Sequence, residues 1–208
     1  MTQRTAPATA DELLLRFRRF HSDYFPLHQQ RFQDLVTSGQ HPKILFIGCS
    51  DSHVLPYLLT GTGPGELFIV RNVGAFVPPY GSSHGMHGTT AAFEFAVLSL
   101  GVEPFIVCGH SHCGAIRAVY EGVPEEAVSL RSWLQLASEA LLTVQPCSEA
   151  LRRTEQRAVV LQLERLMDYP MVQGQGTAGQ LTLHGWHYVI EDGEVHIFDA
   201  QQGGFVPA

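Results

Sequence analysis

Three short apolar runs stand out in a chain whose hydrophobic and polar residues otherwise alternate in irregular blocks. They cover residues 43–48, 66–71 and 104–109, and each has glycine or proline at or beside one of its ends. Continuous apolar runs of this length are typical of strands buried on both faces of a sheet. We therefore expect three parallel strands in the first half of the chain.

Segments with helical spacing separate and follow these strands. The predicted helices cover residues 89–100, 115–120, 130–143 and 149–167. Two later apolar segments, residues 181–190 and 194–198, flank a turn at 191–193 and predict a hairpin. Strands that alternate with helices favour right-handed crossovers. The predicted fold class is therefore α/β, with a mostly parallel central β-sheet flanked by helices.

The N-terminal segment has a different pattern. Apolar residues between Leu14 and Tyr24 have helical spacing, which Pro26 interrupts before the spacing resumes. One or two helices are expected there, ahead of the main fold. The sequence thus predicts an N-terminal helical arm over residues 1–40 and one α/β domain over residues 41–208.

Composition narrows the classes of function. Apolar residues make up 45% of the 208 residues and charged residues 16%, which suits a folded core. The net charge of −7 disfavours nucleic acid and anionic membranes as partners, since both need clustered Lys and Arg. The apolar stretches are shorter than the roughly 18 residues that span a bilayer, and residues 1–10 lack the apolar segment of a secretory signal. We expect a soluble, cytoplasmic protein.

Metal-ligating residue types gather in two segments, residues 48–53 and 109–114, each directly after a predicted buried strand. Loops at the carboxyl ends of parallel strands form the sites of open α/β sheets, so these segments can face each other. Cys49, His110 and Cys113 would supply the ligands of a catalytic zinc site, in which three protein ligands leave a fourth position open. Spacing alone leaves buried structural thiols as an equal alternative.

The other cysteines and histidines nearby are expected to have different roles. Cys108 should belong to the core of its strand, and Cys147 has no comparable neighbours. His112 should point away from the ligand histidine, as a surface or supporting group. His84 and His87 lie in a glycine-rich stretch, where solvated loop residues are expected and a proton shuttle is the alternative.

Longer motifs follow one another in a characteristic order. They lie at residues 47–52 (IGCSDS), 64–72 (PGELFIVRN), 108–114 (CGHSHCG) and 183–186 (LHGW). With these motifs the chain resembles the β-class carbonic anhydrases along nearly its whole length, particularly their bacterial, cyanobacterial-like branch. The resemblance implies a four-stranded, mostly parallel core sheet with an extra edge strand. It also implies an N-terminal arm that reaches over a partner subunit, in a homodimer or a dimer of dimers.

The resemblance further implies an activity, the zinc-dependent reversible hydration of CO₂ to bicarbonate and a proton. Cys49, His110 and Cys113 match the family's ligands to one Zn²⁺ per subunit. Asp51 matches its catalytic aspartate, which accepts a hydrogen bond from the zinc-bound hydroxide and orients it. The pocket for the substrate would be formed by Val73, Gly74, Ala75 and Gly114.

The sequence departs from the family's pattern beside this site. His53 occupies the position of an arginine that pairs with the aspartate and holds it off the zinc, Ala75 replaces a usually polar residue, and His87 replaces an acid. A guanidinium is always charged and binds a carboxylate through two parallel hydrogen bonds, whereas an imidazole is partly neutral and offers one. Asp51 could then bind the zinc as a fourth ligand and displace the water.

Two hypotheses follow from these departures. In the first, the protein is a working hydratase, or a hydrolase of COS or CS₂, with Asp51 and His53 as its catalytic residues. In the second, Asp51 closes the zinc site, and a protein with low or no activity has a structural or regulatory role. The intact ligands and aspartate favour the first hypothesis, and the missing arginine favours the second.

Overall fold

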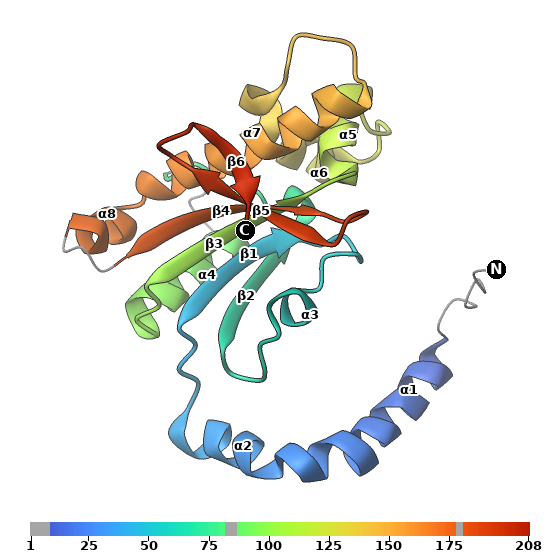
Figure 1. Ribbon diagram of the computed structural model, residues 1–208, viewed down its shortest axis with the longest axis vertical. Helices are drawn as coiled ribbons and strands as arrows, with labels where there is room; N and C mark the ends of the chain where they lie inside the picture. The colour runs from blue at the N-terminus through green and yellow to red at the C-terminus, as the bar shows by residue number, and fades with distance from the viewer. Residues whose placement is uncertain (1–8, 82–86, 178–180) are drawn as a thin grey trace. The chain divides into compact units, whose positions relative to one another are not determined.

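A computed structural model describes residues 9–81, 87–177 and 181–208 (Figure 1). The chain forms two compact units, which divide between Gln40 and His41. No helix within these described ranges is long and apolar enough to cross a membrane.

The first unit is one continuous run of helix. It consists of α1 (Ala10–Arg19), a π-helical turn (Phe20–Tyr24) and α2 (Phe25–Ser38). Of the one or two helices expected, the backbone forms one run that stays helical through Pro26. Pro26 falls in the first turn of α2, a position where proline is tolerated because its φ already suits a helix. The irregularity is instead the π-helical turn that precedes it.

The second unit contains a six-stranded sheet. Its strands are β1 (Ile44–Cys49), β2 (Leu67–Asn72), β3 (Pro104–His110), β4 (Thr182–Val189), β5 (Glu194–Asp199) and β6 (Gly204–Pro207). They pair in the order β2-β1-β3-β4-β5-β6, and the first four are parallel. The pairs β4–β5 and β5–β6 are antiparallel. The predicted α/β class with a mostly parallel sheet is confirmed, and two added edge strands stand where one was expected.

Short helices and one long helix connect the strands. They are α3 (Pro56–Thr60), α4 (Gly88–Glu94), α5 (Gly114–Glu121), α6 (Val128–Leu134), α7 (Ser148–Met167) and α8 (Pro170–Thr177). Two predicted helices change type before they end. Helix α4 widens into a π-helical turn (Phe95–Ser99). Helix α6 continues as a 3₁₀ helix (Gln135–Ala140), where the Ser138 hydroxyl bonds to the Gln135 carbonyl.

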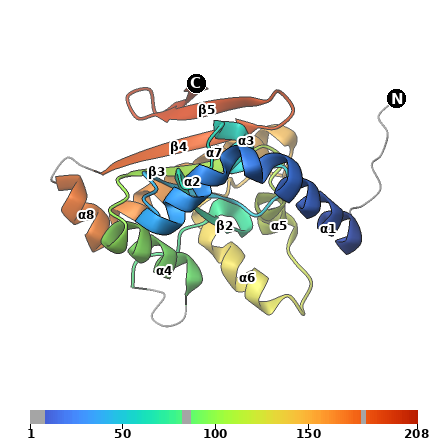
Figure 2. The same ribbon diagram turned by 90° about the horizontal axis from the view of Figure 1, so that it is seen from below.

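The core lies mainly on one face of the sheet. Leu45 and Ile47 on β1 and Phe105 and Val107 on β3 point to the face covered by α4, α7 and α8. Alternate residues, such as Phe46, form a smaller cluster on the opposite face. Figure 2 shows β3, β4 and β5 following one another in pairing order, with α4 to one side of them.

Two glycines let α7 pack directly on β3 and β4. A Cβ at Gly109 would lie 2.6 Å from Cγ2 of Val159, and a Cβ at Gly185 would lie 3.0 Å from Cγ1 of the same valine. Any larger residue at Gly109 would push the helix and strand apart. This close approach brings the N-terminal half of α7 next to the end of β3.

Candidate metal centre

Three metal-ligating side chains converge where β1 and β3 end. Cys49 is the last residue of β1, His110 is the last residue of β3, and Cys113 is the N-cap of α5. Because β1 pairs in parallel with β3, the carboxyl ends of these strands lie together. The ligand atoms of the three residues lie within 4.8 Å of one another, and all three residues are buried. The cluster could therefore hold a metal ion.

The hydrogen bonding of His110 leaves one ring nitrogen ready for a metal. Its Nδ1 lies 2.9 Å from the carbonyl oxygen of Ser111. A carbonyl can only accept, so Nδ1 carries the proton and Nε2 presents a bare lone pair. Nε2 is buried and has no hydrogen-bond partner in the described part of the chain. Two thiols and such an imidazole fit the Cys₂His ligand set that zinc accepts.

The two thiols differ in acidity. Cys49 Sγ accepts hydrogen bonds from the amides of Asp51 at 3.4 Å and Gly74 at 3.3 Å. The neighbouring Cys113 thiol is the main reason why the pKa of Cys49 lies well below its usual range. The interaction between the two thiols, together with burial, raises the pKa of Cys113. Metal binding would therefore displace a proton from Cys113.

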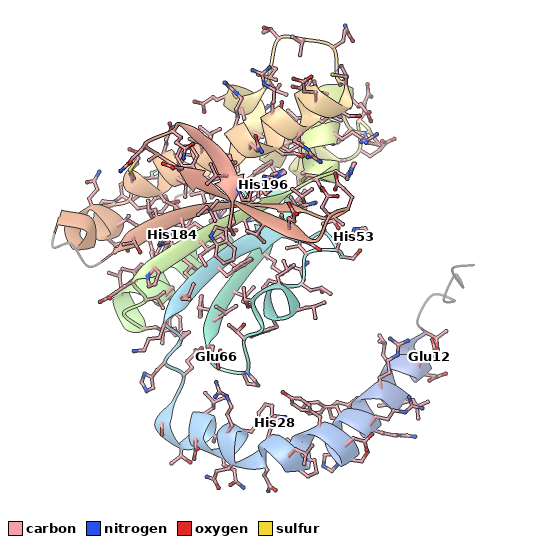
Figure 3. All side chains as sticks on the ribbon, in the orientation of Figure 1. Glu12, His28, His53, Glu66, His184 and His196 are labelled. Carbon is pink, nitrogen blue, oxygen red and sulfur yellow. The ribbon has the colours of Figure 1, made fainter. Side chains whose placement is uncertain are left out.

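His53, labelled in Figure 3, lies in the loop between β1 and α3 and holds the Asp51 carboxylate. The His53 amide donates to Asp51 Oδ1 at 2.9 Å, and the ring Nδ1 lies 2.7 Å from the same oxygen. The bond from the His53 amide contributes most to lowering the pKa of Asp51, and the imidazole adds to it. The Asp51 carboxylate lies outside the cluster of three ligands. It is therefore ionised and held at one oxygen.

Arg71 secures the backbone that carries Cys49 and Asp51. Its Nε donates to the carbonyl of Cys49 at 2.9 Å, and its Nη2 donates to the carbonyl of Asp51 at 2.7 Å. The register of β1 against β2 places Arg71 opposite Gly48. Arg71 belongs to one of the sequence motifs, but only this register reveals what it binds.

The turn after β2 forms one side of the site. Asn72 closes the turn through two hydrogen bonds to the backbone of Phe76, at 2.8 and 2.9 Å. Gly74 adopts a φ of 87°, and a Cβ there would lie 2.4 Å from the Phe76 ring, so only glycine fits. Trp133 Nε1 donates to the Val73 carbonyl at 2.7 Å. These contacts hold the Gly74 amide toward the ligand cluster.

A small, mostly apolar cavity adjoins two of the ligands. Its walls are formed by His110 and Cys113 with Gly74, Ala75, Val107, Gly109, Ile116, Glu155, Ala158, Val159 and Gln162. Two of the residues expected to form the substrate pocket, Gly74 and Ala75, are in these walls. Val73 is 40% exposed, and Gly114 is the first residue of α5; neither lines the cavity.

Glu191 ties the loop between the last two ligands to the β4–β5 hairpin. Ser111 Oγ donates to Glu191 Oε2 at 2.6 Å, and His112 Nε2 lies 3.4 Å from the same oxygen. Arg152 forms an ion pair with the other oxygen. The bond from Ser111 is the largest cause that lowers the pKa of Glu191 to about 2. His112 is thus an exposed loop residue paired with an acid.

The remaining cysteines and histidines lie apart from the cluster. Cys108 is buried in β3, where burial raises the pKa of its thiol to about 12, and Cys147 is exposed. The expectation that His87 is a solvated loop residue is wrong, because it is half-buried and stacks on Trp133 with 5.8 Å between ring centroids. His84 lies outside the described residues.

A family model described as carbonic anhydrase matches residues 44–195, which include all three clustered ligands and the strands that carry them. The chain belongs to the β-carbonic anhydrase family. The expected resemblance is thereby confirmed.

Similar proteins extend the family match over most of the chain. The carbonic anhydrase of Pseudomonas aeruginosa is 41% identical over 196 residues, which are 91% of this chain and 88% of the relative. The carbonic anhydrase of Synechococcus elongatus is 36% identical over 192 residues, which are 88% of this chain and 70% of the relative.

Solved β-carbonic anhydrases have the same fold. The structure of CcaA is similar with a TM-score of 0.90 at 36% identity, covering 95% of this chain and 91% of that chain. A structure from the work on two tetrameric β-carbonic anhydrases of Sordaria macrospora has a TM-score of 0.78 at 27% identity, covering 91% of this chain and 97% of that chain.

Removing one thiol of the cluster should abolish metal binding by this family member, whereas removing the neighbouring thiol of β3 should not. We expect the wild type and Cys108→Ala to retain about one zinc per chain after dialysis, and Cys113→Ala to lose it, because three protein ligands are the minimum for such a site. Metal analysis of the dialysed proteins measures this. Equal zinc content in Cys113→Ala and the wild type would contradict the ligand assignment.

The contribution of Glu191 to stability should depend on pH. A carboxylate whose pKa is lowered from 4.5 to about 2 stabilises the folded state above about pH 4.5 and loses this effect as the pH falls toward 2. Because the side chain is 38% exposed, solvent screening should limit the effect to roughly 1 kcal/mol. Urea denaturation of the metal-free protein should show Glu191→Gln less stable than the wild type at pH 7. The difference should be less than half as large at pH 3 and should nearly vanish at pH 2.

The exposed acid Glu121 provides the control for this measurement. Glu121→Gln should differ little from the wild type at either pH, since no ion pair or hydrogen bond holds its carboxylate among the contacts of the described residues. A destabilisation by Glu191→Gln that is the same at pH 7 and pH 3 would show that the carboxylate charge is not involved.

Proposed function

We propose that this protein catalyses the zinc-dependent reversible hydration of CO₂ to bicarbonate and a proton. The observation that carries the proposal is the combination of a buried Cys₂His cluster with an Asp51 carboxylate that His53 holds outside it. Zinc bound at this cluster would lower the pKa of a coordinated water toward 7 and so supply a nucleophile at neutral pH.

Asp51 is suited to orient that nucleophile. His53 occupies only Oδ1, and Oδ2 has no hydrogen-bond partner within the described ranges. A carboxylate oxygen can only accept while the group is ionised, and the lowered pKa keeps it ionised at neutral pH. Oδ2 is thus available to accept a hydrogen bond from a hydroxyl beside the ligands.

His53 can do part of the work of the absent arginine. It makes two hydrogen bonds to Asp51, one from the backbone amide and one from the ring, and the amide bond does not depend on the charge of the imidazole. Arg71 adds a second restraint, because it fixes the Asp51 carbonyl. These contacts support an open fourth position over a site closed by Asp51.

The walls beside the ligands are mostly apolar, although the cavity between them is only about 10 Å³. Val107, Ile116, Ala158 and Val159 line it with apolar side chains. CO₂ has no hydrogen to donate and loses little on leaving water for such walls. COS and CS₂ have the same linear shape, so hydrolysis of these molecules is the alternative that an activity assay must compare.

The cysteines are all unpaired thiols, which suits a protein that functions in the reducing cytoplasm. All four cysteines are free, and two of them would serve as metal ligands, which requires that they stay reduced. We therefore infer a cytoplasmic enzyme.

Substitution of His53 tests the role of the Asp51 contact. His53→Ala keeps the amide bond to Asp51 and removes only the ring bond, so it should lower kcat/KM for CO₂ by about tenfold. His53→Arg should be at least as active as the wild type, because a guanidinium binds the carboxylate more strongly. Stopped-flow measurement of CO₂ hydration by the zinc-loaded proteins gives these rates. His184→Ala, which changes an exposed histidine on β4 (Figure 3), is the matched control.

Two results would argue against this function. Full activity of His53→Ala would show that the ring contact with Asp51 is not needed. An inactive wild type that gains activity in His53→Arg would favour the structural or regulatory role, with Asp51 on the zinc.

We further propose that the arm serves assembly, as a homodimer or a dimer of dimers. Within its described length, α1 and α2 bury no residue, although Leu13, Phe17 and Leu27 are large apolar side chains. Phe17 stacks on Phe20, which stacks on Tyr24, so aromatic rings are grouped along the helix. Exposed apolar surface of this kind marks an interaction site, and a second copy of the chain is the partner that the tetrameric relatives favour.

Polar substitutions in the aromatic group should weaken this assembly. The double variant Phe17→Ser, Phe20→Ser should sediment as a smaller species than the wild type at micromolar concentration, because it removes much of the apolar surface that the contact would bury. Arg18→Ser, on the same helix, should leave the assembly unchanged. Analytical ultracentrifugation measures both, and a double variant that assembles like the wild type would contradict the proposal.

A further inference from the structure

A buried acid and imidazole lie behind the ligand cluster. Glu155 on α7 is 4% exposed and His187 on β4 is fully buried, with 3.3 Å between Oε2 and Nε2. Burying a carboxylate away from water is costly unless hydrogen bonds compensate for the lost solvation. The buried pair is therefore stable only if hydrogen bonds from the surrounding residues compensate for the lost solvation.

The packing of α7 on the sheet places Glu155 near the ligand loop. Glu155 lies one helical turn before Val159, the residue that fills the space left by Gly109 and Gly185. The backbone oxygen of Glu155 would be only 3.7 Å from a Cβ at Gly109. Its side chain can therefore reach past the end of β3.

The Glu155 side chain bonds to the backbone of Cys113, one of the three clustered residues. Oε1 of Glu155 accepts a hydrogen bond from the amide of Cys113 at 3.1 Å, while Oε2 faces His187. Each carboxylate oxygen thus has a partner, one in the ligand loop and one in β4. The carboxylate is a bridge between a strand of the sheet and the residue that carries the third thiol.

The Cys113 amide has a particular need for such a partner. Cys113 is the N-cap of α5, so its carbonyl begins the helix by accepting from Arg117, but its amide precedes the helix. The preceding residue, His112, adopts a left-handed φ of 59°, which turns the chain out of β3. At this bend neither the strand nor the helix supplies an acceptor, and Glu155 does.

Burial of the His187 ring is itself unfavourable for the stability of the fold. Its Nδ1 is buried and has no hydrogen-bond partner in the part of the chain described by the structure, and its ring meets Phe205 edge-on at 6.1 Å between centroids. A buried ring nitrogen left without a partner destabilises the fold. The hydrogen bond between His187 Nε2 and Glu155 is the favourable contact that this buried position offers.

We propose that Glu155 is a positioning residue for the metal: it holds the Cys113 amide so that Sγ faces Cys49 and His110, and His187 holds Glu155 in place. The inference rests on the proposed zinc function of the cluster. Groups that orient the ligands of a metal commonly change affinity by about ten- to a hundredfold when they are removed. Glu155 acts here on the backbone of the ligand and not on its sulfur.

The test measures metal binding directly. Zinc affinity of the full-length protein is determined by competition with a chelator, and Co²⁺ replaces zinc so that the thiolate charge-transfer and d–d bands report the ligand geometry. Glu155→Ala should bind zinc about ten- to a hundredfold more weakly and shift the Co²⁺ bands. Glu155→Gln keeps an acceptor for Cys113, and its amide NH₂ can donate to His187 Nε2 when the imidazole carries its proton on Nδ1. Both readouts should therefore return close to the wild type.

A neighbouring buried residue controls for loss of stability alone. Thr154 is fully buried on α7, and its hydroxyl bonds to Tyr120 and to the Ala150 carbonyl. Thr154→Ala should lower the melting temperature and leave zinc affinity and the Co²⁺ spectrum unchanged. If Glu155→Ala does not fold, Glu155→Asp serves in its place, because the shorter side chain cannot reach both partners.

The outcomes separate this inference from the proposed function. A Glu155→Ala or Glu155→Asp variant that melts earlier but binds zinc and Co²⁺ like the wild type would overturn the inference, since the pair would then only tie α7 to β4. A wild type that binds no zinc would overturn both. A wild type that binds zinc and hydrates CO₂, with an unchanged Glu155 variant, would overturn the inference alone.

Discussion

The hydrogen-bonded ladder between β1 and β3 aligns Gly48 with Cys108, and the two strands run in the same direction. Their carboxyl ends therefore meet, and each delivers one residue of the candidate metal site, Cys49 and His110, to the same small volume. The third ligand follows after a bend that returns the chain as a helix. The position of the site thus depends on backbone pairing made deep in the sheet, where neither water nor side-chain motion competes with it.

The parts that follow from local pattern could be predicted from the sequence. The buried strands have apolar runs that end in glycine, and Cys49, His110 and Cys113 follow them in motifs that indicate a metal site. Short elements without such a pattern, such as α3 and β6, could not be predicted. Contacts between distant residues were equally hidden. Glu155 is one of several acids on a charged helix, and nothing in the order of residues indicates that it faces Cys113.

The surroundings of Asp51 show why a substituted motif residue is hard to interpret from sequence alone. The comparison of imidazole with guanidinium considers only the side chains, and it predicts weak control of the carboxylate. In the folded protein the turn also directs the His53 amide to the same oxygen, and Arg71 binds the carbonyl of Asp51. Backbone groups, which every residue type possesses, therefore supply part of the restraint that a motif assigns to one side chain.

The contact of Val159 with Gly109 and Gly185 also limits how this protein can change over time. Cγ2 of Val159 occupies the place of a Cβ at Gly109, and Cγ1 of Val159, together with Leu163 and Phe198, crowds the place of a Cβ at Gly185. An alanine at position 109 requires a smaller residue at position 159, and a smaller residue at 159 leaves a gap over position 185. The three positions therefore cannot drift independently. An exchange at one of them becomes tolerable only in a background where another has already changed.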